Sequence, residues 1–194
     1  GRVTGSHLTS MHSMDNYYVS KLIPLIQEAG VHAVANPLIN ITLQGRHDSY
    51  PKRRGMTRVP ELLAAGVNVG FGHDCVMDPW YSLGSGDMLE VAAMGLHVAQ
   101  MTSQAGMRQC FDAVTGNSAR ILGLDGYGLA PGCRADFLLL QARSPAEAPC
   151  SLPRCTSCSS ASCIRAAAST PWAGMSNTAI RPSPRVLIVK PAPR

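Results

Sequence analysis

The sequence predicts an α/β fold made of parallel β/α units, and two observations support this prediction. Over residues 1–125, short apolar runs that favour β-strands alternate with segments of helical periodicity. A polar residue ends or closely follows each of the three predicted strands, and these residues are His7, Asn36 and Asp74. In β/α barrels, the side chains that carry out chemistry lie at the carboxyl ends of the strands. We therefore expect a functional site where these three residues come together.

The predicted elements follow from periodicity and from capping residues. Strands are predicted over residues 2–7, 31–35 and 67–71. Helices are predicted over residues 15–30, 58–65, 87–101, 107–114 and 118–122. Asp15 and Asp87 are typical helix N-caps, and Asn117 is a candidate cap between the last two helices. Residues 38–54 are predicted to form a long loop.

Two further regions follow the β/α units. Residues 126–148 contain turn-forming Gly and Pro before the apolar run 137–140, which indicates a return to a small β domain. Residues 149–194 are rich in Ser, Ala, Pro, Arg and Cys and are predicted to be disordered. A shift of reading frame in a GC-rich gene explains this composition better than a functional extension does.

The formal net charge of +5 is concentrated near the C-terminus. Seven Lys or Arg residues and one Glu occur from Arg143 onward, which leaves a net charge of −1 on residues 1–142. This distribution argues against a basic groove, so we expect no nucleic-acid partner. No apolar run reaches the roughly 18 residues that a membrane span needs, and no secretory leader opens the chain. We expect a soluble, cytoplasmic protein without a membrane partner.

Four cysteines crowd into the tail. Cys155 and Cys158 resemble half of a zinc knuckle, with Cys150 and Cys163 close by. Because the spacing does not match a standard pair of knuckles, we do not expect structural zinc there.

Asp74 and His7 are the main candidates for chemistry. A carboxylate at a strand end can ligate a divalent metal or act as a general base, although a turn cap is the more frequent role of such a residue. The imidazole of His7 can bind a metal or hydrogen-bond a metal-held water, but a buried histidine satisfied by the backbone is more common. The pair, on neighbouring strands, is more informative than either residue alone.

The other histidines carry weaker signals. His32 and His97 are expected to be structural, and His47, in the predicted loop, is a candidate substrate contact. His73 is expected to point to the opposite side of the strand from Asp74.

Four segments are long and specific enough to indicate a family. They are SHLTSMHS (6–13), ANPLINITLQGRHDSYPKRRG (35–55), GHDCVMDPWYSLGSGDMLEV (72–91) and GLAPGCRADFLLL (128–140). In this order they resemble bacterial cytosine deaminases of the amidohydrolase superfamily, over roughly residues 1–148. The resemblance implies the C-terminal part of a (β/α)₈ metal-dependent hydrolase barrel, to which residues 1–125 contribute three strands. Residues 126–148 would be a remnant of the small β domain.

The resemblance also implies a site and a reaction. One divalent metal ion, iron or zinc, would be ligated by Asp74, which would also shuttle a proton. His7 would hydrogen-bond the metal-bound hydroxide, and Trp80 would shape the substrate pocket. The implied reaction is the hydrolytic deamination of cytosine to uracil and ammonia. The full-length protein would act on a small amino-heterocycle and is expected to form a homo-oligomer.

Two departures from the family pattern leave alternatives open. The other metal ligands and the acidic glutamate of the family are not found between Gly1 and Arg194, so the chain alone is predicted to be inactive. Cys75 stands where cytosine-specific members have an aspartate facing the substrate, and a thiol is a poorer hydrogen-bond partner. The substrate could therefore be creatinine, an s-triazine, guanine or another amino-heterocycle. A non-catalytic fragment is the alternative from another class.

Overall fold

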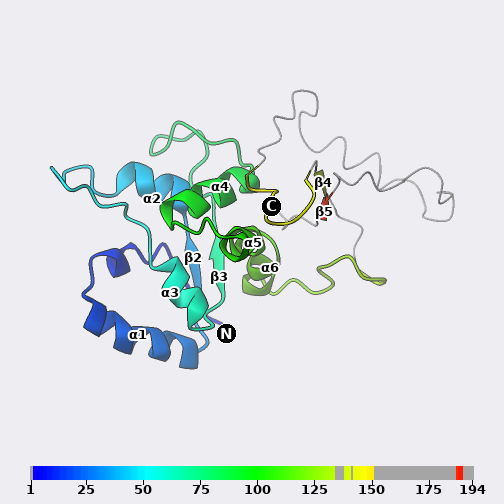
Figure 1. The fold of residues 1–194 in the computed structure, drawn as a ribbon, viewed down its shortest axis with the longest axis horizontal. Helices are drawn as coiled ribbons and strands as arrows, with labels where there is room; N and C mark the ends of the chain where they lie inside the picture. Colours follow the sequence, from blue (N-terminus) through cyan, green and yellow to red (C-terminus); the bar gives the residue numbers. More distant parts are fainter. Residues whose placement is uncertain (1, 134–137, 141, 151–186, 190–194) are drawn as a thin grey trace.

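The computed structural model describes residues 2–133, 138–140, 142–150 and 187–189 (Figure 1). At the centre of these residues lies a three-stranded parallel sheet in the order β1-β2-β3. The strands are β1 (Thr4–Ser6), β2 (His32–Ala35) and β3 (Val69–Phe71). Because the strands are parallel and in register, their carboxyl ends lie at one edge of the sheet. The α/β fold with parallel strands is thus confirmed, and closure into a barrel remains a prediction.

Helices follow each strand and pack around the sheet. They are η1 (Thr9–His12), α1 (Asn16–Glu28), α2 (Pro37–Leu43), α3 (Val59–Ala64), α4 (Met88–Val98), α5 (Gln104–Ala113) and α6 (Gly116–Ile121). Helices α3, α4, α5 and α6 all contact β3, so β3 is covered by protein. The predicted caps are confirmed for α1 and α4, because the carboxylates of Asp15 and Asp87 accept hydrogen bonds from backbone N–H groups of the first turn.

The core is formed by the sheet and the helix faces turned towards it. Its fully buried side chains include Leu62, Val69 and Val91. Helix α4 lies so close to β3 that a Cβ at Gly95 would lie only 2.4 Å from the ring of Phe71. This packing fixes the carboxyl end of β3, and with it the residues that follow.

Two predictions about local structure are wrong. The loop predicted over residues 38–54 begins as helix α2, because Pro37 occupies its first turn, where a fixed φ and a missing N–H are tolerated. Leu38 and Ile39 then bury their side chains in the core. Asn117 does not cap α6, because it lies within that helix and its side-chain amide donates to the carbonyl of Val69.

The strand predicted over residues 137–140 is present as β4 (Leu138–Leu140), which pairs antiparallel with β5 (Leu187–Val189). The prediction of a disordered tail is therefore wrong for residues 187–189. Leu140, Ala142 and Ala148 form a small second core with Leu89 and Phe111 of α4 and α5. The rest of the tail, with the Cys155 and Cys158 motif, lies outside the described residues.

In the part of the chain that the structure describes, none of the helices has the length and apolar character needed to cross a membrane.

Candidate active site

The chain turns sharply after β1 and after β3, at His7 and at Asp74. The backbone N–H of His7 donates to the carbonyl of Val34 at 2.8 Å, which extends the pairing of β1 with β2 by one residue. His7 has a φ of 63° and Asp74 a φ of 65°, both in the left-handed region that is uncommon for residues other than glycine. Backbone strain of this kind is concentrated at functional sites. Both residues lie at the carboxyl edge of the sheet, where His7 directly follows β1 and Asp74 follows β3 by three residues.

His7 and Asp74 are in contact there. Nε2 of His7 lies 3.2 Å from Oδ2 of Asp74, and the two side chains are 39% and 34% exposed. The expectation that these residues come together is confirmed. The prediction that their strands are neighbours is wrong, because β2 lies between β1 and β3. His7 is also not a buried histidine satisfied by the backbone, because its ring contacts two side chains, those of Asp74 and Asn40.

Asn40 is the site residue that sequence reasoning missed. Its side-chain amide lies 2.9 Å from Nδ1 of His7 and is almost fully buried. Asn36, which was expected to join the pair, is buried at the start of α2 and donates its backbone N–H to Asn40 instead. The available signal was the spacing of the two asparagines, since positions four apart share one face of a helix. The prediction of a loop in this region concealed it.

Cys75 lies beside Asp74 as a neutral thiol. Its sulfur donates to Oδ1 of Asp74 at 3.8 Å. The pKa of Cys75 is raised to about 11, mainly by a hydrogen bond to the carboxylate of Asp78, and further by burial and by the charge of Asp74. At neutral pH, the group next to the Asp74 carboxylate is therefore an uncharged S–H.

Trp80, the other residue expected to contact substrate, has a mainly exposed side chain. It is 71% exposed, and its backbone N–H donates to the carboxylate of Asp78 at 2.9 Å. Its role in substrate binding stays a prediction.

His73 and His97 have structural roles. Nδ1 of His73 donates to the carbonyl of Cys75 at 2.8 Å, and its Nε2 accepts the N–H of Gly86 at 3.2 Å. Nδ1 of His97 donates to the carbonyl of Ala93 at 2.6 Å. Both nitrogens of His73 and one nitrogen of His97 thus contact the backbone, and the structural role expected for His97 agrees with this contact.

Asp74 is the residue of this edge best suited to ligate a metal ion. Its carboxylate is partly exposed and is held by an imidazole and a thiol. Among the described residues, no group of three His, Cys, Asp or Glu side chains is arranged to hold a metal ion. The described residues of this edge therefore offer the carboxylate of Asp74 as one donor group and not a complete metal site.

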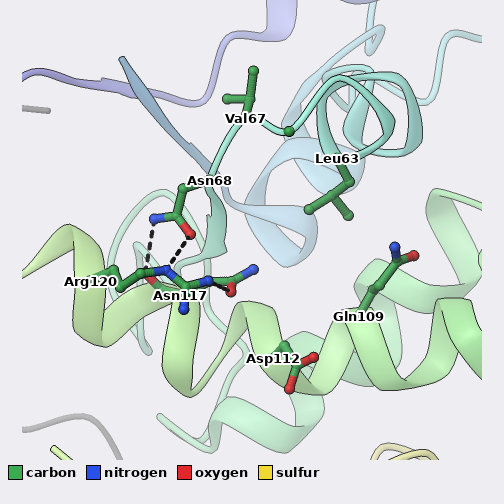
Figure 2. A pocket seen from close by; sticks show the side chains of 8 residues that line it. Leu63, Val67, Asn68, Gln109, Asp112, Asn117 and Arg120 are labelled. Carbon is green, nitrogen blue, oxygen red and sulfur yellow. Dashed lines mark hydrogen bonds between the residues drawn. The ribbon is translucent and has the colours of Figure 1, made fainter. Parts of the chain in front are cut away.

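A cavity lies at the opposite edge of the sheet, where β3 begins (Figure 2). It has a volume of about 310 Å³ and is lined by Leu63, Gly66, Val67, Asn68, Gln109, Asp112, Asn117 and Arg120. The guanidinium of Arg120 donates hydrogen bonds to the side chains of both Asn68 and Asn117 (Figure 2). Because the chemistry of β/α folds takes place at the carboxyl edge, we do not assign this cavity to the active site.

Comparisons with known proteins agree with this arrangement. The model of the amidohydrolase family matches residues 1–153. The crystal structure of 5-methylcytosine deaminase from Klebsiella pneumoniae, liganded with 5-fluorocytosine, superimposes with a TM-score of 0.73 at 49% identity, covering 76% of this chain and 36% of that one. N-isopropylammelide isopropylaminohydrolase from Burkholderia multivorans superimposes with a TM-score of 0.64 at 31% identity, covering 76% and 35% of the two chains.

A curated relative gives the same result by sequence. Pterin deaminase of Rhizobium rhizogenes is 36% identical over 149 residues, which are 76% of this chain and 34% of the relative. The chain thus spans about a third of the length of the proteins it matches.

Proposed function

Because this chain belongs to the amidohydrolase family, we propose that it is part of a metal-dependent deaminase to which it contributes Asp74 and His7. The complete enzyme would hydrolyse cytosine to uracil and ammonia. The observation that supports this best is the 3.2 Å contact between Nε2 of His7 and Oδ2 of Asp74 at the carboxyl edge of the parallel sheet. Both groups are partly exposed there, so a substrate can reach them.

In the proposed reaction, a water oxygen bonds to the ring carbon that bears the amino group. The bond from that carbon to the amino nitrogen then breaks, and ammonia leaves. Of the two protons of the water, one ends on the ring nitrogen and the other on the ammonia. Asp74 is the general base that takes a proton from the attacking water and returns it to the leaving nitrogen. His7 donates a hydrogen bond to the attacking oxygen and holds it in place.

Asp74 would also be this chain's ligand to the divalent metal, iron or zinc. Such an ion, when bound, makes a water molecule more acidic. Since the described residues offer no set of three ligands, we propose that the chain alone is inactive.

Cys75 bears on which cytosine is the substrate. The thiol beside Asp74 is neutral and small, so it adds no second charge to the substrate side of the site. A cytosine substituted at the 5-position is the second candidate substrate, because a solved relative at 49% identity is a 5-methylcytosine deaminase liganded with 5-fluorocytosine. Cys75→Asp is expected to raise the preference for cytosine over bulkier amino-heterocycles.

A chimera tests the proposal. Residues 1–148 replace the corresponding segment of the Klebsiella pneumoniae enzyme. Ammonia release is measured with cytosine, 5-methylcytosine and pterin, and isopropylamine release is measured with N-isopropylammelide. We expect turnover of the two cytosines and a loss of about 10²-fold or more in Asp74→Asn. Asp87→Asn is the matched control, because asparagine caps a helix as well as aspartate does. Turnover of pterin or N-isopropylammelide, without turnover of either cytosine, would refute the proposed cytosine substrate. An active Asp74→Asn variant would refute the role of Asp74.

A further inference from the structure

The buried amide of Asn40 is oriented by a partner that can act only as a donor. Asn40 lies in α2 and is 2% exposed. Its Oδ1 accepts the backbone N–H of Asn36 at 3.3 Å. Because a backbone N–H cannot accept a hydrogen bond, this contact assigns the oxygen of the amide to Asn36 and its NH₂ group to His7. A buried amide in an apolar core is costly unless both ends are bonded, so this orientation is strongly favoured.

The orientation of the amide determines where His7 carries its proton. The NH₂ group of Asn40 can only donate, and it lies 2.9 Å from Nδ1 of His7. Nδ1 must therefore be the acceptor, without a proton of its own. In the neutral ring, the proton then sits on Nε2, the atom that faces Oδ2 of Asp74 at 3.2 Å.

We propose that Asn40 is a positioning residue that holds His7 in the tautomer with its proton on Nε2. The Nε2–H group then points at the Asp74 carboxylate and, in the complete enzyme, at the reacting oxygen. The opposite tautomer would present a lone pair to a carboxylate and could not donate. The catalytic part of this inference rests on the proposed function, whereas the tautomer is a property of this chain alone.

The chain contains its own standards for the measurement. Nδ1 of His73 and Nδ1 of His97 each face a backbone carbonyl, which can only accept, so both rings must carry their proton on Nδ1. His7, by contrast, is expected to carry its proton on Nε2. The difference is directly visible in the nitrogen chemical shifts of the imidazole rings.

The experiment is an NMR spectrum of the 194-residue chain with ¹⁵N-labelled histidine, recorded at a pH where the imidazoles are neutral. The signals of His7 are assigned by their loss in His7→Gln. We expect the Nε2–H pattern for His7 and the Nδ1–H pattern for His73 and His97. A Nδ1–H pattern for His7 in the unmodified chain would overturn the proposal, whatever the variants show.

Two variants test the cause. Asn40→Asp replaces the donor by an acceptor and is expected to shift the proton of His7 to Nδ1. Asn40→Leu removes the donor with little change in volume and is expected to give a mixture of tautomers. Asn117→Leu is the matched control, because it removes another buried asparagine, at the far edge of the sheet, and should leave His7 unchanged. A pure Nε2–H pattern in either folded Asn40 variant would contradict the role of Asn40.

The outcome is separable from that of the proposed function, because the spectrum needs no turnover. An inactive chimera with the Nε2–H tautomer would remove the proposed function and leave this inference in place. An active chimera with the Nδ1–H tautomer would leave the proposed function in place and remove this inference.

Discussion

The two edges of the central sheet carry polar groups that are held in different ways. At the amino edge, Arg120 donates to the side chains of Asn68 and Asn117, and Asn117 donates to the carbonyl of Val69. These contacts join α6 to β3. At the carboxyl edge, Asp74 is held by an imidazole and a thiol, and a third of its side chain remains exposed.

The comparison shows that a cavity by itself does not identify the site. The cavity of about 310 Å³ lies at the amino edge, where hydrogen bonds connect neighbouring elements of this chain. At the carboxyl edge, the bonds orient side chains that are still open to a ligand, and both key residues have a strained backbone. We infer that the amino edge serves stability and the carboxyl edge serves chemistry, which is the division typical of β/α folds.

The largest expected effect is the loss of activity when His7 is removed. In the chimera, His7→Gln is expected to lower kcat by about 10²-fold, because the flexible amide of glutamine does not hold its donor at the place where the imidazole holds Nε2–H. Asn117→Ala, at the other edge, is expected to leave kcat almost unchanged. Steady-state assays of both variants check this contrast, and equal losses in the two would end the distinction between the edges.

Asn117→Ala is instead expected to destabilise the fold. The substitution removes the hydrogen bond to the carbonyl of Val69 and one of the two side-chain hydrogen bonds of Arg120, at a cost of about 1–3 kcal/mol in the free energy of unfolding. His7→Gln should cost less than this, since His7 is 39% exposed. Urea denaturation of the two variants measures the difference, and a larger loss for His7→Gln would reverse the assignment of the two edges.

The thiol of Cys75 provides a smaller test of the carboxyl edge. Its pKa of about 11 has the hydrogen bond to Asp78 as its largest cause, so alkylation by iodoacetamide at neutral pH should be slow. Asp78→Asn is expected to lower this pKa and to speed up alkylation, by roughly tenfold for each unit that the pKa falls. Cys110 is the internal control, because burial raises its pKa to about 12. Mass spectrometry of the alkylated peptides shows whether only Cys75 responds.

The smallest effect is expected from the ion pair of Asp48 and Arg53, in the loop after α2. The side-chain hydrogen bond from Arg53 lowers the pKa of Asp48 to about 2, from a usual value of 3.8. The folded-state pKa is depressed, so the stabilisation is fully present above 3.8 and is lost as the pH falls through about 2. Because the pair is exposed, the change should be small. Thermal unfolding over this pH range should show a slightly weaker acid dependence in Asp48→Asn, and an identical dependence would contradict the contribution of the pair.

The parts of the fold that depend on local pattern could be predicted from the sequence. The helix caps at Asp15 and Asp87 and the three parallel strands are examples, because a cap or a strand is signalled within a few residues. Helix α2 was missed, since it is short and its apolar residues face a core that local pattern does not reveal. The pairing of β5 with β4 was missed because the two strands are far apart in the sequence.

The candidate site divides in the same way. His7 and Asp74 could be named in advance because polar residues at strand ends are unusual next to apolar runs. Asn40 could not, because nothing near it in the sequence says that its amide meets a ring 33 positions away. The contact exists only once α2 is placed beside the end of β1.

The order of the residues alone determined that parallel strands would bring a carboxylate and an imidazole to one edge of a sheet, because strand direction follows from the alternation of strand and helix. Only the tertiary structure decided which nitrogen of the imidazole meets the carboxylate, and which amide lies behind the ring. The physical reason is that hydrogen bonds between side chains depend on distances of a few tenths of an ångström, and packing sets these distances.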